Sequence, residues 1–93
     1  MALDAGDLLV SNAFPVEGDR LTLDVTARNS GGAELRGLRL TLRVDGVDHQ
    51  TIDVNVPAGA GVPVRFAWRA IAGEHLLEVT ALDVVITRSL RVR

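Results

Sequence analysis

The stretch LTLDVTAR, residues 21–28, decides the fold class, because apolar and polar residues alternate along it. Side chains of a β-strand point alternately to two faces, so a period of two predicts a strand with one apolar and one polar face. A strand that buries only one face is typical of antiparallel sheets, since parallel strands are usually covered on both faces. The stretch therefore predicts an antiparallel sheet whose polar face meets water.

The same alternation recurs along the rest of the chain and is interrupted by turn signals. It reappears in residues 38–45, 52–56, 62–69 and 77–81. Asp45-Gly46 lies between two of these runs and predicts a two-residue type I′ hairpin, which needs positive φ at both central residues. Shorter strands are expected at 8–10 and 86–92, with Asp83 at the last turn.

About seven short strands in a chain of 93 residues predict one domain that spans residues 1–93. The expected fold class is an all-β, antiparallel, immunoglobulin-like or fibronectin-type-III-like sandwich. Val64, Phe66 and Trp68 share the apolar face of their strand. Trp68 is therefore expected in the core rather than on a binding surface.

Composition and charge exclude several functional classes. The chain contains no Cys, which excludes disulfides, thiolate metal sites and cysteine nucleophiles. Ten basic against twelve acidic residues give a net charge of −2, which argues against a dedicated nucleic-acid or membrane-surface binder. No signal peptide is visible at the start of the sequence. The apolar runs fall far short of the roughly 20 residues that a membrane-spanning helix needs, so no membrane span is expected.

Short motifs follow one another along most of the chain, from Asp7 to Asp83. They are Asp7-Leu8-Leu9-Val10, Pro15-Val16-Glu17-Gly18-Asp19, Val25-Thr26-Ala27-Arg28-Asn29-Ser30-Gly31, Val44-Asp45-Gly46-Val47, Pro57-Ala58-Gly59 with Val64-Arg65-Phe66-Ala67-Trp68, and Gly73-Glu74-His75 with Val79-Thr80-Ala81-Leu82-Asp83. In this order they resemble the CARDB family, the cell-adhesion-related bacterial domain. The motif that begins at Val25 is similar to that family's V-x-N-x-G strand end, and the last to its G-x-H … V-x-A-x-x-D pattern.

The resemblance implies a seven-stranded sandwich used as an appended or repeated module, with no catalytic residue and no cofactor. It implies a non-catalytic adhesion, structural or spacer role in a bacterial or archaeal surface or secreted protein. The module would then lie outside the cell or at its surface, with neighbouring domains or another protein as partners. An alternative is a carbohydrate- or protein-binding accessory domain appended to an enzyme. That role needs an exposed aromatic residue at a loop end, for which Phe14 is the candidate.

Few residues could carry chemistry, and we expect neither an enzyme nor a metal site. His49 and His75 have no metal-ligand spacing and are expected to be solvated residues at strand ends. Asp45 and Asp48 lack the ligand density of a calcium loop, so Asp45 is expected to bond nearby backbone N–H groups of its turn. The three serines, Ser11, Ser30 and Ser89, lie in no nucleophile motif.

Outward-facing arginines are the most suggestive surface feature. Arg39 and Arg43 share one face of a strand, and Arg65 and Arg69 share a face of another, which is expected in the opposite sheet. One interpretation is contact with an acidic partner or a polysaccharide. The other is cross-strand pairing with carboxylates such as Asp24, Asp53 and Glu78, worth at most about 1 kcal/mol for each pair.

The trailing strand is expected at a sheet edge and next to an apolar patch. Leu76, Leu82 and Val85 are predicted to lie together there and, with Arg39 and Arg43, to form a contact face. Such a patch would suit a weak homodimer or the docking of the next module. Arg88 breaks the apolar face of this strand. It is either an inward-pointing charge that prevents edge-to-edge aggregation or the mark of a bulge.

Overall fold

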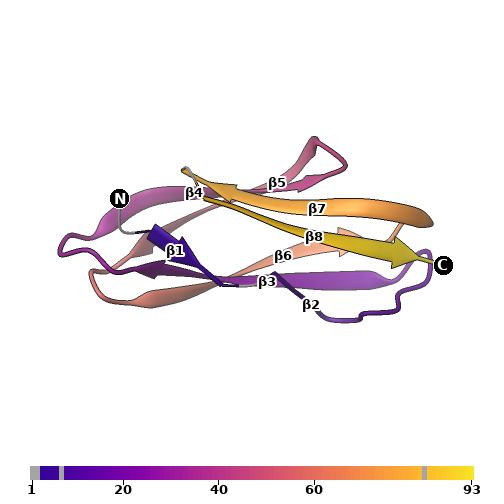
Figure 1. Cartoon of the computed structure of the whole chain (residues 1–93), viewed down its shortest axis with the longest axis horizontal. Helices are drawn as coiled ribbons and strands as arrows, with labels where there is room; N and C mark the ends of the chain where they lie inside the picture. Colours follow the sequence, from indigo (N-terminus) through magenta and orange to yellow (C-terminus); the bar gives the residue numbers. More distant parts are fainter. Residues whose placement is uncertain (1–2, 7, 83) are drawn as a thin grey trace.

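Two antiparallel β-sheets face each other across an apolar core in the computed structural model of the chain (Figure 1). The structure describes residues 3–6, 8–82 and 84–93. The first sheet contains β1 (Leu3–Ala5), β2 (Leu9–Val10), β3 (Arg20–Asn29) and β6 (Gly61–Arg69). The second contains, in spatial order, β5 (Val47–Val56), β4 (Leu35–Val44), β7 (Gly73–Ala81) and β8 (Val84–Val92).

The leading strand is split into two short pieces that pair with one strand. β1 pairs with the end of β3 and β2 with its middle, while β6 also pairs with β3. Counted as one broken strand, β1 and β2 give the seven strands expected, and the prediction of an all-β antiparallel sandwich is confirmed. Asp83, expected at the last turn, lies outside the described residues. Its neighbour Leu82 has a φ of 56°.

The core is built from the apolar faces that the alternation predicts. Leu21 and Leu23 of β3 lie opposite Trp68 and Phe66 of β6, and all four are at most 3% exposed. The prediction that Trp68 is a core residue is thus confirmed. The second sheet contributes its own inward rows, with the buried residues Leu38, Leu40, Leu42, Val56, Leu77, Val79, Ala81, Leu90 and Val92.

The two termini leave opposite ends of an elongated molecule. Leu3 pairs with Asn29, the last residue of β3. Arg93 donates its N–H to the Pro15 carbonyl and accepts from the N–H of Glu17, shortly before β3 begins at Arg20. The long axis measures 44 Å against 21 and 17 Å across, and Figure 1 shows the C-terminus at the far end from β1.

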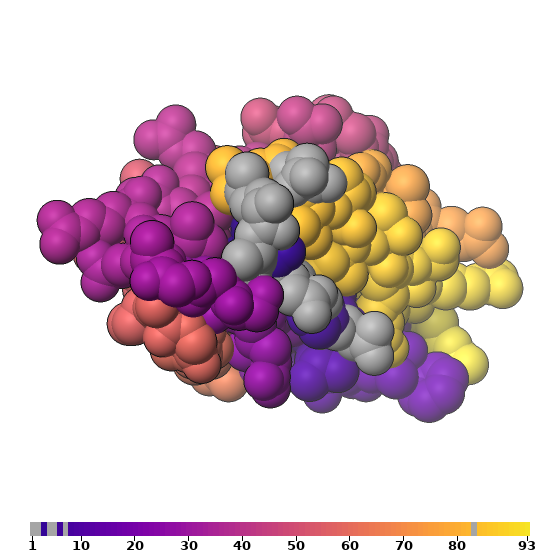
Figure 2. All heavy atoms as spheres, turned by 60° about the vertical axis from the view of Figure 1, so that its left-hand side comes forward, coloured from indigo at the N-terminus to yellow at the C-terminus, as the bar shows by residue number. Residues whose placement is uncertain are grey.

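One polar side chain bridges the sheets at each open side of the sandwich. Gln50 of β5 accepts through Oε1 from the N–H of Ala67 in β6, at 3.0 Å. On the other side, Nη1 of Arg88 donates to the Leu8 carbonyl at 3.0 Å, and Figure 2 shows β8 (yellow) beside the N-terminal segment (indigo). β8 is an edge strand as expected, and its pairing with β7 runs without a register shift, so the bulge interpretation of Arg88 is wrong.

Candidate functional site

The hairpin between β4 and β5 carries a cluster of polar contacts that reaches β7. Asp45 and Gly46 have φ values of 53° and 81°, so the predicted positive φ at both turn centres is confirmed. Oδ1 of Asp45 accepts from the N–H of Leu76 at 2.9 Å, and the Asp45 N–H donates to the Leu76 carbonyl. The carboxylate therefore bonds to β7, 31 residues along the chain, rather than to its own turn as the sequence suggested.

His75 lies inside this cluster. Its side chain is only 10% exposed, and its ring meets Trp68 edge-on, with the ring centroids 5.1 Å apart. The prediction that His75 is a solvated residue is therefore wrong. The physical reason is the period of β7, which turns His75 inward with Leu77 and Val79. His49, in contrast, is exposed as predicted.

Both ring nitrogens of His75 face oxygen acceptors. Nδ1 lies 2.6 Å from Oδ2 of Asp45, and Nε2 lies 2.7 Å from the Ile71 carbonyl oxygen. A carbonyl and an ionised carboxylate can only accept, so both contacts are hydrogen bonds only in the imidazolium form, which carries a proton on each nitrogen. The bond to Asp45 raises the pKa of His75 most strongly, against the opposing effect of burial. The same bond and the Leu76 N–H lower the pKa of Asp45.

A groove of about 710 Å³ opens beside this cluster, between the hairpin and the end of β6. Its lining includes Asp48 and His49 as well as His75, and its rim carries the exposed side chains of Val47 and Ile71. Because both nitrogens of His75 are already bonded, this histidine is not available as a metal ligand. No three His, Cys, Asp or Glu side chains gather in a metal-binding arrangement among the residues that the structure describes.

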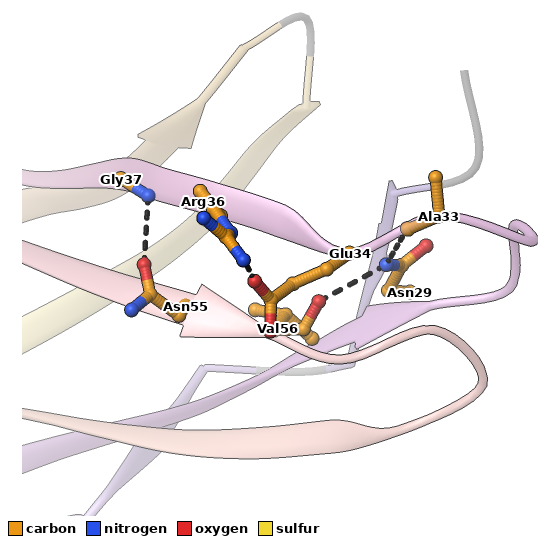
Figure 3. Close-up of polar contacts among 7 residues, drawn as sticks. All are labelled: Asn29, Ala33, Glu34, Arg36, Gly37, Asn55 and Val56. Atoms are coloured by element: carbon orange, nitrogen blue, oxygen red, sulfur yellow. Dashed lines mark hydrogen bonds and ion pairs between the residues drawn. The ribbon is translucent and has the colours of Figure 1, made fainter.

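The opposite end of the molecule is organised by Asn29, a buried residue whose side chain bonds to Ala33 and Val56 (Figure 3). Its Nδ2 donates to the carbonyl oxygens of Ala33 at 2.7 Å and Val56 at 3.1 Å, and its Oδ1 accepts from the Gly31 N–H at 3.0 Å. Its backbone N–H and carbonyl bond to the β5–β6 loop, at Ala60 and Gly59.

Asn29 thus joins the β3–β4 loop, the end of β5 and the β5–β6 loop. The sequence reasoning treated it only as part of a turn and missed this role. The available signal was its position, because Asn29 continues the inward row of Leu23, Val25 and Ala27. A polar residue in such a row must satisfy its hydrogen bonds inside the protein.

The residues of the predicted contact face are all exposed, but they do not form one patch. Leu82 lines a shallow hollow with Arg39 and Thr80, and Val85 lies opposite Thr80. Leu76 lies opposite Ser89, which is four residues further along β8 than Val85, or about 13 Å. The expected grouping of Leu76 with Leu82 and Val85 is therefore wrong. A role of Leu82 and Val85 in association remains a prediction.

Three of the outward-facing arginines pair with carboxylates of neighbouring strands, which is the second of the two interpretations given above. Arg39 donates to Asp53 at 3.1 Å, and Arg43 to Asp48 at 2.6 Å, both on the outer face of the second sheet. Arg65 binds Asp24 through two nitrogens, at 2.8 and 3.1 Å, on the other sheet. This contact lowers the pKa of Asp24.

Comparison with known proteins relates most of the chain to one family. The CARDB family model matches residues 5–87. The CARDB domain of PF1109 from Pyrococcus furiosus has been solved in solution and as crystals with di-metal ions. These structures match at TM-scores of 0.83 and 0.86 with 16% and 14% identity, over 98% of this chain and 94% and 87% of theirs.

A third similar structure belongs to a much longer protein. The b-glucosidase EmGH1 of Erythrobacter marinus matches over 98% of this chain but only 15% of its own length, at a TM-score of 0.81 and 16% identity. No curated protein matched. The described residues contain no helix long and apolar enough to cross a membrane.

Proposed function

The chain belongs to the CARDB family, and from this premise we propose that it is a non-catalytic spacer module of a surface or secreted protein. It would hold the domains before and after it at a fixed separation, and so support adhesion or presentation by its neighbours. The observation that carries this proposal is the exit of the two termini at opposite ends of a 44 Å long sandwich.

The internal contacts support a rigid connector. The two ends are each tied by a polar cluster, through His75 at the hairpin end and through Asn29 at the other. Gln50 and Arg88 bridge the sheets at the two open sides. Each of these groups is engaged in hydrogen bonds within the fold, which is the use expected of a structural rather than a catalytic residue.

The similarity to EmGH1 supports a modular use. There, a region of matching fold accounts for 15% of a longer enzyme chain. Such a placement also suits the alternative function, a carbohydrate- or protein-binding accessory domain attached to an enzyme. Phe14, whose side chain is 77% exposed, favours this alternative, because an exposed aromatic ring can stack on a sugar.

Chains of one, two and three fused copies test the spacer proposal. We expect the maximum dimension measured by small-angle X-ray scattering to grow by about 44 Å with each copy. A flexible Gly/Ser chain of equal length grows only with the square root of its length and serves as the control. Growth like that of the flexible control would contradict the proposal. Binding of a neutral polysaccharide that is lost in Phe14→Ala would instead favour the alternative.

A further inference from the structure

The outer face of the first sheet is rich in arginine. β3 directs Arg20 and Arg28 outward, and β6 directs Arg65 and Arg69 outward, against Asp24 as the only carboxylate on these two strands. The chain as a whole has a net charge of −2. The positive charge of this face is therefore opposite in sign to that of the rest of the protein.

One of these arginines, Arg65, is paired with a carboxylate, because it binds Asp24 in the two-nitrogen contact described above. Arg28 lies on the part of β3 that pairs with β1. Arg20 and Arg69 differ, because they lie directly opposite each other in the β3–β6 pairing.

Like charges directly opposite each other on antiparallel strands repel and are destabilising. Both side chains are exposed, and no carboxylate binds either of them in the part of the chain that the structure describes. Of the nearest acidic residues, Asp19 uses Oδ2 to accept from the Val16 N–H, and Glu17 lines the hairpin groove with Arg69 without an ion pair. The neighbouring outward positions, Thr22 and Ala67, are small and leave the two guanidinium groups accessible.

We propose that Arg20 and Arg69 together bind the carboxylate groups of an acidic polysaccharide. A guanidinium group matches a carboxylate with two parallel hydrogen bonds. A carboxylate placed between the two arginines also removes their mutual repulsion. The free energy of its binding is therefore more favourable than that of a contact with a single arginine.

Recognition on this face rests on charge rather than on stacking. The outward positions beside the pair, Thr22, Asp24 and Ala67, offer no aromatic ring on which a base or a sugar could stack. A nucleic acid is the alternative anionic polymer, and the test below distinguishes its phosphates from carboxylates. The proposal goes beyond the spacer role and does not depend on it.

The test uses the complete chain and oligogalacturonate as the probe, with its methyl-esterified form as an uncharged control. Binding is followed by NMR shift changes at low and at physiological ionic strength. We expect oligogalacturonate to shift resonances of β3 and β6, and the esterified form to leave them unchanged. The double variant Arg20→Gln/Arg69→Gln should weaken binding roughly tenfold, whereas Arg91→Gln, on the other sheet, should not.

Thermal unfolding separates recognition from folding. Arg69→Gln should leave the melting temperature unchanged or raise it, since it removes a like-charge contact. Absence of binding at low ionic strength, or equal weakening by Arg91→Gln, would overturn the proposal. So would a single-stranded DNA probe that binds more tightly than oligogalacturonate through the same two arginines, because the face would then recognise phosphate.

Discussion

Nδ1 of His75 lies 2.6 Å from Oδ2 of Asp45, although 30 residues separate the two along the chain. Asp45 is held in a hairpin turn with φ of 53°, and His75 is held by Trp68 and the Ile71 carbonyl. The contact therefore fixes the β4–β5 hairpin to β7 and to the loop that precedes β7. Because it depends on two charged forms, it links this end of the fold to pH.

The pH dependence follows from the directions of the two pKa shifts. The raised pKa of His75 means that the folded protein keeps a proton which the unfolded chain releases above about pH 6.5. We therefore expect a stabilisation that is complete below about pH 6.5 and is lost as pH rises through the raised pKa. Thermal unfolding from pH 6 to 9 measures this slope, and Asp45→Asn should flatten it.

The Asp45→Asn variant provides the control for this prediction, because it removes the carboxylate that most strongly raises the pKa of His75. NMR titration should show His75 losing its proton at a lower pH in the variant than in the unchanged protein. An unchanged titration of His75 would contradict the role of Asp45.

Asn29→Ala should destabilise the domain by about 2–4 kcal/mol, because it leaves the buried Val56 carbonyl and the partly buried backbone groups of Gly31 and Ala33 without their partner. Asn55→Ala is the matched control. Asn55 accepts from the Gly37 N–H at an exposed position, so its loss should cost less than about 1 kcal/mol. Chemical denaturation measures both, and equal costs would show that Asn29 does not organise this end.

Trp68→Ala should cost about 3–5 kcal/mol through the cavity that it leaves. It also removes the ring that packs against His75, so the imidazolium loses its apolar support. Phe14→Ala, at a 77% exposed position, should change stability by less than about 0.5 kcal/mol. The tryptophan fluorescence of the folded protein should resist an aqueous quencher, and ready quenching would place Trp68 at the surface.

Gly46→Val should destabilise by about 1–3 kcal/mol, since a β-branched residue resists the φ of 81° at this turn. Gly32→Val tests whether the effect comes from the backbone. Gly32 also has open space around its Cα, but its φ lies outside the left-handed region. Equal destabilisation by both variants would mean that backbone strain at Gly46 is not the cause.

If the isolated domain forms a weak dimer, Leu82→Arg should weaken it, because Leu82 and Val85 are both more than half exposed in the β7–β8 hairpin. Leu76→Arg should have little effect, since the register places Leu76 well away along β7. Sedimentation over a concentration series compares the two variants. A dimer that is insensitive to Leu82→Arg but sensitive to Leu76→Arg would place the contact beside the β4–β5 hairpin.

Alternation along the sequence was sufficient to predict the strands and most of the core, because burial of one face imposes a period of two on every strand. The same period also indicates which polar residues point inward, and the sequence interpretation did not use it for them. Asn29 and His75 each occupy an inward position of their strand, and both are held inside by hydrogen bonds. Their partners lie 27 and 30 residues away and depend on how strands pair, which alternation does not specify.

The incorrect grouping of Leu76 with Leu82 and Val85 has the same origin. Alternation correctly assigns Leu76 to the outer face, but its neighbour across the hairpin depends on the register between β7 and β8. That register pairs it with Ser89 rather than Val85. Arg69 is a similar case, because the sequence offers several carboxylates as partners while the β3–β6 pairing places Arg20 opposite it.

The exit of the termini at opposite ends determines how the domain bears mechanical load. β1 begins at Leu3 at one end and β8 ends at Val92 near the other, so a pull on the termini acts along both strands. All the hydrogen bonds of each terminal strand are then sheared together rather than opened one at a time. β1 has only three paired residues and β8 has nine, so β1 should detach first. Single-molecule stretching should show a small, low-force extension before the main rupture, and Leu3→Pro should abolish only that first event.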